Sequence, residues 1–246
     1  MQFKVEMPLT YAFIVMFIIV FLYELYIGIY RGTYMLEKMF SFYGFSPAGF
    51  IKGQWWTVIT NMFIHAGPEH LILNMVALFF FGGVIERELG KIKFLTIFFL
   101  SGIFGNLVII IASFFGLMPA DMPTVGASAA IFGLLGAAML VKPDALAFYP
   151  YIIPVPIILV ALIYAMYNVM SFLLVISSGI QTEISYISHI GGLLVGIGLG
   201  FREEGEKKGF RMLLLILLIL ILLPFLWKFI EMLQVTNWMT MVVPGK

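Results

Sequence analysis

A serine beside an apolar stretch is the first candidate for chemistry in this chain. Ser128 lies where a loop with two prolines and an aspartate (119–123) gives way to an apolar run, and Gly126 just before it permits a tight turn. This places Ser128 at or beside a helix N-terminus, where unpaired N–H groups and the helix dipole favour a developing anion. The position suits a nucleophile and its oxyanion donors. On this segment alone, a serine that only caps a membrane helix is the favoured interpretation.

Histidine is the usual base for a serine nucleophile at neutral pH. The chain has three histidines, His65, His70 and His189, and no cysteine, which excludes thiolate catalysis and thiolate metal sites. No acidic residue lies in the predicted helices that contain Ser128 and His189, so we expect a Ser–His dyad rather than a triad. Phe132, one turn below Ser128, could hold the imidazole by ring packing.

Two further side chains could bind an oxyanion. His70 and Asn74 are four residues apart and therefore share one helix face. Both can donate hydrogen bonds to a tetrahedral oxyanion, beside the backbone N–H of Ser128. The acidic residues Asp121 and Glu183 fall in predicted outer loops, where we expect them to be solvated.

A metal site is the rival use of the histidines. His65 and His70 are five residues apart with Glu69 beside the second, which is not the HExxH spacing of a zinc protease helix. Three histidines from separate segments could still meet around a metal, but Ser128 and Asn74 would then have no role. We expect no metal and no cofactor.

The composition defines the environment of these residues. The 246-residue chain is 62% hydrophobic and 11% charged, whereas a soluble domain is nearer half apolar and a quarter charged. We therefore expect a single integral membrane domain over residues 1–246, with the lipid bilayer around it. A formal net charge of +1 gives no indication of a nucleic-acid partner.

Seven apolar runs predict an all-α polytopic membrane protein. They cover residues 9–29, 70–85, 94–115, 129–141, 157–176, 189–201 and 210–229. The first run is too long for a signal peptide and lacks a small-residue cleavage site. Residues 30–68 are rich in aromatic side chains, which is typical of the membrane interface. Glu24 in the first run is expected to reach the headgroups or pair with Arg31.

Basic residues in the short connections predict a cytoplasmic N-terminus in the cell membrane. In that orientation nine of them lie inside and five outside. The inner set is Lys4, Arg87, Lys91, Lys93, Lys142, Arg202, Lys207, Lys208 and Arg211, and the outer set is Arg31, Lys38, Lys52, Lys228 and Lys246.

The candidate residues share one depth in this orientation. Measured from the inner charged residue that ends each helix, the separations are 14 residues for Ser128, 13 for His189, 12 for Asn74 and 16 for His70. These correspond to roughly 18 to 24 Å in a hydrocarbon layer about 30 Å thick. Polar groups inside a bilayer are costly unless they face one another or a wet cavity. Four at one depth favour a functional site that opens toward the outer side.

Small residues predict close approach of the helices that carry Ser128 and His189. Glycines recur every four residues on one face of the predicted helix 189–201, and the helix 129–141 offers small residues in return. These residues are Gly192, Gly196 and Gly200 on the first helix, and Ala129, Gly133 and Gly136 on the second.

At these residues the sequence resembles the rhomboid family of intramembrane serine proteases. The family's Gly-x-Ser-Gly segment is matched by Gly126-Ala127-Ser128 with alanine following. Its histidine with glycines at +3 and +7 is matched by His189, Gly192 and Gly196.

Two more motifs extend the resemblance to residues 55–200, nearly the whole predicted six-helix core. The family's histidine–asparagine helix is matched by the stretch from His65 through His70 to Asn74. Its Gly-Gly-x-x-Glu turn is matched by residues 82–86.

The resemblance implies specific roles. Ser128 would be the nucleophile, His189 the general base, and His70 and Asn74 contributors to the oxyanion hole, while His65 would support and hydrate the site. Substrates would be membrane-spanning proteins cut near their outer ends. The helix 157–176 and the loop 177–186 would form the lateral gate and cap. The resemblance also implies a core of six transmembrane helices over about residues 9–201, with the run 210–229 as an added seventh helix.

Two departures from the family pattern affect packing. Ala129 replaces the glycine after the serine, from which we expect tighter packing without loss of function. The family's Trp-Arg pair is absent, because Trp56 is followed by Thr57, and this puts the usual bracing of that connection in doubt.

Two alternatives to a protease stay open. A catalytically silent rhomboid-like protein would bind and escort membrane clients, but such proteins typically lose the serine or the histidine, and this chain has both. A small transporter would need broken helices with charged residues at the midplane, which the runs from 70 to 201 lack.

Overall fold

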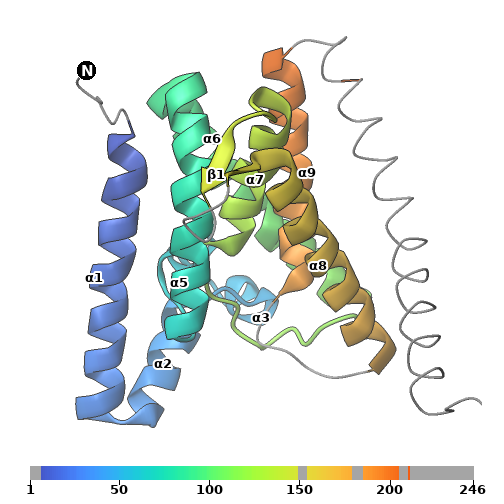
Figure 1. Ribbon diagram of the computed structural model, residues 1–246. Helices are drawn as coiled ribbons and strands as arrows, with labels where there is room; N and C mark the ends of the chain where they lie inside the picture. The colour runs from blue at the N-terminus through green and yellow to red at the C-terminus, as the bar shows by residue number, and fades with distance from the viewer. Residues whose placement is uncertain (1–6, 149–153, 179–184, 205–209, 211–246) are drawn as a thin grey trace, which may run out of the picture. The chain divides into compact units, whose positions relative to one another are not determined.

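The computed structural model describes residues 7–148, 154–178, 185–204 and 210. The chain divides into two compact units, Met1–Glu204 and Gly205–Lys246. The description below concerns the first unit, whose described residues are mostly helical (Figure 1). The predicted seventh helix, 210–229, falls outside the described residues except for Phe210.

The first helix, α1 (Pro8–Arg31), corresponds to the predicted run 9–29. Its first N–H groups have no intrahelical acceptor, and the Glu86 carboxylate accepts those of Leu9 at 2.8 Å and Thr10 at 2.7 Å. The Thr10 hydroxyl donates to the same carboxylate at 2.8 Å. Glu86 therefore caps α1 with a charge of the sign that the helix dipole favours.

The prediction for Glu24 is wrong. This residue does not reach the headgroups or Arg31; its side chain is 2% exposed and its carboxylate accepts the backbone N–H of His65 at 3.1 Å. The carboxylate thus supplies an acceptor to a loop N–H that lies outside any helix, as buried backbone donors require.

The aromatic connection folds into short helices. These are α2 (Thr33–Tyr43), α3 (Pro47–Ile51), α4 (Thr57–Thr60) and the 3₁₀ turn η1 (Asn61–Phe63). Several of its aromatic side chains are exposed, as residues at a membrane interface would be: Tyr34, Phe42, Tyr43, Trp55 and Trp56.

The predicted runs 70–85 and 94–115 form one helical stretch with a sharp turn. It consists of α5 (Pro68–Ala77), the π-helical segment η2 (Leu78–Gly82) and α6 (Gly83–Phe114). Gly90 inside α6 has φ 83° and ψ 173°, a conformation that favours glycine. A Cβ placed on Gly82 would lie 3.0 Å from the Phe94 ring. Residues twelve apart touch only if the chain reverses, so Gly90 separates two helical arms.

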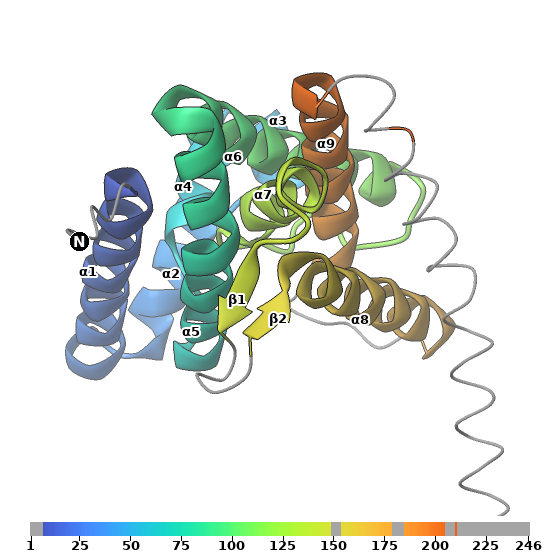
Figure 2. The ribbon, with the colours of Figure 1, turned by 45° about the horizontal axis from the view of Figure 1, so that its top comes forward.

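The remaining described helices are α7 (Ser128–Val141), α8 (Ile157–Ser178) and α9 (Tyr186–Glu204). A two-stranded antiparallel ribbon that the sequence did not predict, β1 (Leu146–Phe148) with β2 (Pro154–Pro156), precedes α8. Figures 1 and 2 show α8 running obliquely past α7 and α9, with its C-terminal end directed away from them.

Helices α7 and α9 pack backbone to backbone, as the small residues predicted. A Cβ on Gly192 would lie 1.9 Å from the Ala129 carbonyl oxygen, and one on Gly196 would lie 1.9 Å from that of Gly133. The contact is reciprocal: on α7, a Cβ placed on Gly136 would lie 2.7 Å from the carbonyl oxygen of Leu193 in α9. Only glycine permits so short a distance between the two helix backbones. This close packing fixes α9 against the start of α7.

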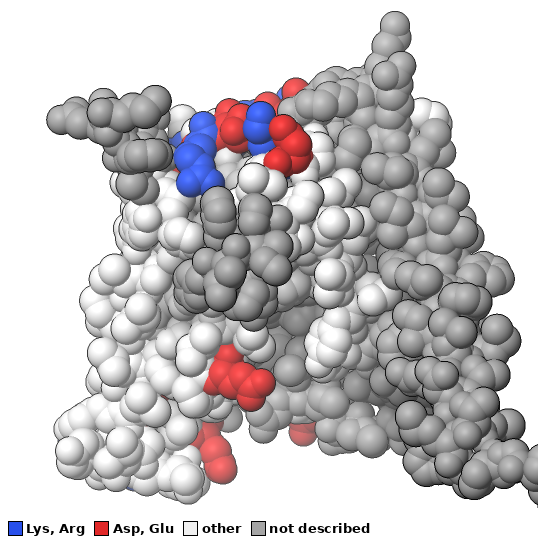
Figure 3. All heavy atoms as spheres, viewed as in Figure 1, with Lys and Arg blue, Asp and Glu red and all other residues white. Residues whose placement is uncertain are grey.

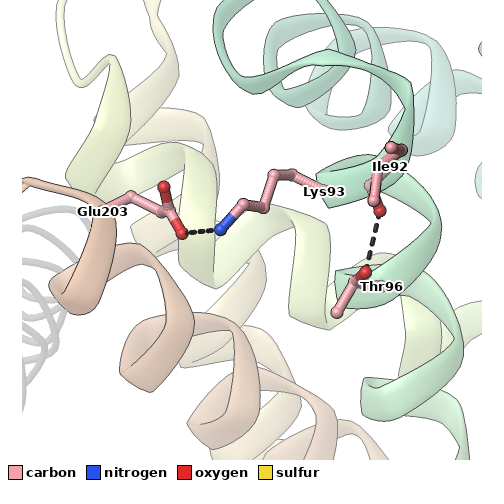
Figure 4. A network of polar contacts seen from close by, with 4 residues as sticks. All are labelled: Ile92, Lys93, Thr96 and Glu203. Atoms are coloured by element: carbon pink, nitrogen blue, oxygen red, sulfur yellow. Dashed lines mark hydrogen bonds and ion pairs between the residues drawn. The ribbon is translucent and has the colours of Figure 1, made fainter.

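Basic and acidic side chains gather at one end of the viewed face, the end at which α9 terminates, and the described surface below it is mostly uncharged apart from a few acidic side chains (Figure 3). At this end an ion pair between Lys93 and Glu203 joins α6 to α9 (Figure 4). Two helical stretches of the described chain, Pro8–Arg31 and Pro68–Phe114, are long and apolar enough to cross a membrane, and α7 and the first part of α8 are shorter apolar helices.

Candidate active site

Ser128 and His189 lie in direct contact although 61 residues separate them in the chain. Ser128 is the first residue of α7 and His189 lies in the first turn of α9. The serine Oγ is 2.7 Å from the imidazole Nε2, which is hydrogen-bond distance. The imidazole is 7% exposed, and the serine is partly accessible.

The His189 ring is held on its face by Phe132. The two ring centroids are 4.5 Å apart with an interplanar angle of 8°. Phe132 is one turn along α7 from Ser128, so the helix that carries the serine also sets the plane of the imidazole. This stacking is the ring packing expected from the sequence.

The imidazole also has a polar partner that sequence reasoning missed. The Nδ1 atom of His189 lies 2.5 Å from Oδ1 of Asn168, which comes from α8 and is 3% exposed. The amide of Asn168 in turn donates from Nδ2 to the backbone carbonyl of Tyr186 at 2.9 Å. The absence of an acid from the predicted helices gave no indication of a third residue, whereas an asparagine inside an otherwise apolar helix is a signal for one.

The loop before Ser128 is fastened to the aromatic connection. Phe45 and Thr124 exchange two backbone hydrogen bonds of 2.9 and 2.7 Å, and the Gly126 N–H donates to the Asn61 carbonyl at 2.8 Å. The Asn61 side chain bonds Asn106 of α6 at 2.9 Å, and Asn106 also donates to the Val58 carbonyl at 3.0 Å.

This network braces the segment in which the family's Trp-Arg pair is absent. The Trp56 indole donates to the Phe42 carbonyl at 2.8 Å and the Thr57 hydroxyl to the Gln54 carbonyl at 2.6 Å. The connection is therefore braced by a buried asparagine pair and local side-chain bonds, which answers the doubt raised by Thr57.

Gly126 allows His70 and Asn74 to approach the serine segment. Its φ of 117° is unfavourable for other residues. A Cβ at this position would lie 2.5 Å from Cε1 and 2.7 Å from Nε2 of His70, and 3.6 Å from Nδ2 of Asn74. The structure thus brings both predicted oxyanion donors against the turn that precedes Ser128.

The Asn74 side chain has an unusual environment. It is 6% exposed, and its Nδ2 has no hydrogen-bond partner among the residues that the structure describes. A buried amide left without an acceptor costs about 1 to 3 kcal/mol, so proteins keep such groups where another requirement outweighs the cost. A donor held ready for an acceptor that arrives with a substrate is one such requirement.

His65 lies next to His70 and to the first helix. Its ring packs edge-on against Phe17 at 5.6 Å and His70 at 5.4 Å between centroids. Burial, with a smaller contribution from His70, lowers the pKa of His65 to about 3, so the ring is neutral at physiological pH. This arrangement suits a packing role.

Ala129 meets the helix that carries Asn106. A Cβ on Gly105 would lie 2.8 Å from the Ala129 Cβ, so the two backbones can approach because position 105 is a glycine. The alanine that replaces the family's glycine is accommodated by this contact.

Comparison with known proteins places these residues in a family. The Rhomboid domain matches residues 52–205, which include the serine segment, the histidine–asparagine helix and the start of α9. The chain belongs to the rhomboid family.

Its relatives include both proteases and a protein named inactive. The rhomboid protease AarA of Providencia stuartii is 31% identical over 59% of this chain and 55% of its own length. The rhomboid protease GluP of Bacillus subtilis is 31% identical over 80% of this chain and 36% of its own length. The inactive RHOMBOID-like protein 8 of Arabidopsis thaliana is 34% identical over 34% of this chain and 22% of its own length. The chain therefore spans little more than half, or less, of each relative.

Proposed function

We propose that this rhomboid family member is a serine endopeptidase that cleaves transmembrane segments of membrane proteins near the outer leaflet. The observation that carries the proposal is the 2.7 Å contact between Ser128 Oγ and His189 Nε2. A serine and a histidine at this distance, with the histidine oriented by other groups, match the geometry of an activated nucleophile.

In the reaction we propose, Ser128 Oγ attacks the scissile carbonyl as His189 Nε2 takes its proton. The negative charge that develops on the carbonyl oxygen is stabilised by Asn74 Nδ2, by His70 and by the Ser128 N–H. His189 then passes its proton to the leaving amine, which leaves an acyl-enzyme on Ser128. His189 then takes a proton from a water molecule that attacks this ester, and returns the proton to Ser128 Oγ as the carboxylic acid product leaves.

We also propose the membrane arrangement that this reaction needs. The helices α1, the two arms on either side of Gly90, α7, α8 and α9 would form six spans, with run 210–229 as a seventh. The N-terminus would be cytoplasmic, which puts the charged end that contains Lys93 and Glu203 inside. The start of α7 would then face the outer side, and α8 would be the lateral gate.

Covalent labelling tests the proposed activity. Detergent-purified protein treated with a fluorophosphonate serine-hydrolase probe should carry the label on the peptide that contains Ser128, and it should cut a generic single-span substrate. Folded protein that neither labels nor cuts would favour the catalytically silent, client-binding alternative, which the inactive Arabidopsis relative keeps open.

The unpaired amide of Asn74 leads to a prediction that separates activity from stability. Asn74→Leu should reduce kcat by about 10²- to 10³-fold, the usual cost of one oxyanion donor. Its free energy of unfolding should stay the same or rise, because the substitution removes a buried amide whose Nδ2 is unsatisfied. Both quantities can be measured on the purified protein, by substrate cleavage and by denaturant titration.

Thr10→Val is the matched control for Asn74→Leu. It also makes a fully buried polar residue apolar, but the Thr10 hydroxyl donates to Glu86. This variant should lose about 1 kcal/mol of stability and keep its kcat. An Asn74→Leu protein with unchanged kcat would remove Asn74 from the proposed oxyanion hole.

A further inference from the structure

We propose that Asn168 is a positioning residue that fixes His189 in the tautomer able to act as a base, and thereby makes the site depend on the placement of α8. The inference rests on the proposed function. It is carried by two hydrogen bonds that join α8 to α9: Asn168 Oδ1 to His189 Nδ1 at 2.5 Å, and Asn168 Nδ2 to the Tyr186 carbonyl at 2.9 Å.

The Tyr186 carbonyl decides which way the Asn168 amide faces. A carbonyl can only accept a hydrogen bond, so the NH₂ group must point to Tyr186 and the amide oxygen must point to His189. The reversed amide would set two acceptors against each other at Tyr186 and would lose that bond.

The orientation of the amide in turn decides the protonation of the imidazole. Because Asn168 Oδ1 only accepts, the neutral ring must carry its proton on Nδ1. The Nε2 lone pair then faces Ser128 Oγ at 2.7 Å, which is the arrangement a general base requires. With the other tautomer, Nε2–H would face the serine hydroxyl and could not take its proton.

The Phe132 ring cannot perform this selection. Stacking at 4.5 Å restrains the plane of the imidazole but does not distinguish a proton on Nδ1 from one on Nε2. Among the described residues, the titratable groups that face His189 are His70, from α5, and Tyr186, one turn earlier on α9. The group at hydrogen-bond distance from Nδ1 is the Asn168 amide oxygen, so we assign the selection to Asn168.

The asparagine comes from a helix other than those of the serine and the histidine. Ser128 and His189 are held together by the glycine contacts between α7 and α9. Asn168 belongs to α8, and the C-terminal end of α8 points away from α7 and α9 (Figures 1 and 2). Moving α8 outward would break the Asn168–His189 bond while leaving the Ser128–His189 contact intact. If α8 moves to admit a substrate, the same movement would therefore also determine whether His189 can take the proton of Ser128.

Substitutions at Asn168 test the proposal. Asn168→Leu, of similar size but without an acceptor, should lower kcat and the rate of fluorophosphonate labelling by the same factor, about 10- to 100-fold, with KM little changed. Asn168→Asp keeps an acceptor for Nδ1 but loses the donor to the Tyr186 carbonyl, so both rates should lie between those of Asn168→Leu and the wild type. Its carboxylate should also move the acid limb of the kcat–pH profile to higher pH, because a negative charge stabilises the imidazolium.

Leu162→Ala is the control for weakened packing of α8. Leu162 is buried on the same helix, and its truncation should lower stability without moving the acid limb of the profile. Equal labelling rates for Asn168→Leu and the wild type, or an Asn168→Asp protein as slow as Asn168→Leu, would overturn the positioning role.

A spectroscopic readout keeps this proposal separate from the proposed activity. The chain has only three histidines, so NMR of protein with isotopically labelled histidine can follow the ring nitrogens of His189. The wild type should show the proton on Nδ1, and Asn168→Leu should show a mixture or the other tautomer. A wild-type ring protonated on Nε2 would refute the inference even in an inactive protein, and absent labelling with the Nδ1–H form present would refute the activity alone.

Discussion

Ser128→Ala and His189→Ala should each reduce kcat on a single-span substrate by about 10⁴- to 10⁶-fold, and the double variant should be no slower than the slower single variant. The reason is that the two side chains act as one unit across their 2.7 Å contact. Without the base the hydroxyl is a weak nucleophile, and without the hydroxyl the base has no proton to take. Kinetics of the two single variants and the double variant in detergent measure the non-additivity.

Ser101→Ala serves as the matched control for the serine substitution. Ser101 is fully buried on α6, and within the described part of the chain its hydroxyl has no hydrogen-bond partner. Removal of this hydroxyl should leave kcat unchanged and should not lower stability. Multiplicative losses in the Ser128/His189 double variant would show that the two residues contribute separately, which would contradict a dyad.

Gly196→Ala should lower the free energy of unfolding by about 3 kcal/mol or more, and Gly196→Val should prevent stable folding. A Cβ at this position would lie 1.9 Å from the Gly133 carbonyl oxygen, and the obstacle is backbone that cannot rotate away. The helices would have to separate, which would also pull His189 from Ser128. Denaturant titration and fluorophosphonate labelling of the same samples measure the two effects.

Gly198→Ala provides the control on the same helix. Apart from its own helix backbone, no atom of the described residues lies within 4 Å of a Cβ placed on Gly198, and the residue is exposed. The substitution should leave stability unchanged or raise it by up to about 1 kcal/mol, because alanine favours a helix over glycine. Equal losses at positions 196 and 198 would mean that helix propensity, and not the close contact with α7, determines the effect.

The predicted helices follow from apolar length alone. Runs such as 9–29 and 157–176 appear as α1 and α8 with ends that differ by at most two residues, because a long apolar run has no stable alternative in lipid. The close approach of α7 and α9 was predictable too, since a glycine every four residues leaves one helix face without side chains.

Hydrogen bonds between residues far apart in the sequence were not predictable in the same way. Glu24 was expected at the headgroups or beside Arg31, yet it accepts the His65 N–H 41 residues away. The hydrogen-bonded pair Asn61 and Asn106 braces the connection in which Thr57 stands in place of the family's arginine. Neither asparagine belongs to a recognisable motif. Each of these contacts depends on how two distant segments are placed, which local periodicity does not encode.

Asn168 illustrates the difference between what the sequence determines and what only the tertiary structure decides. The sequence by itself determined that α8 is a helix, and it determined which residue types the chain offers for chemistry, including a serine, three histidines and no cysteine. Because the sequence of α8 is apolar around most of the helix circumference, it offers no single hydrophobic face from which the rotation of the helix could be predicted. Only the tertiary structure decided that Asn168 faces His189, and with it which imidazole nitrogen faces Ser128, because those choices depend on three helices packing together.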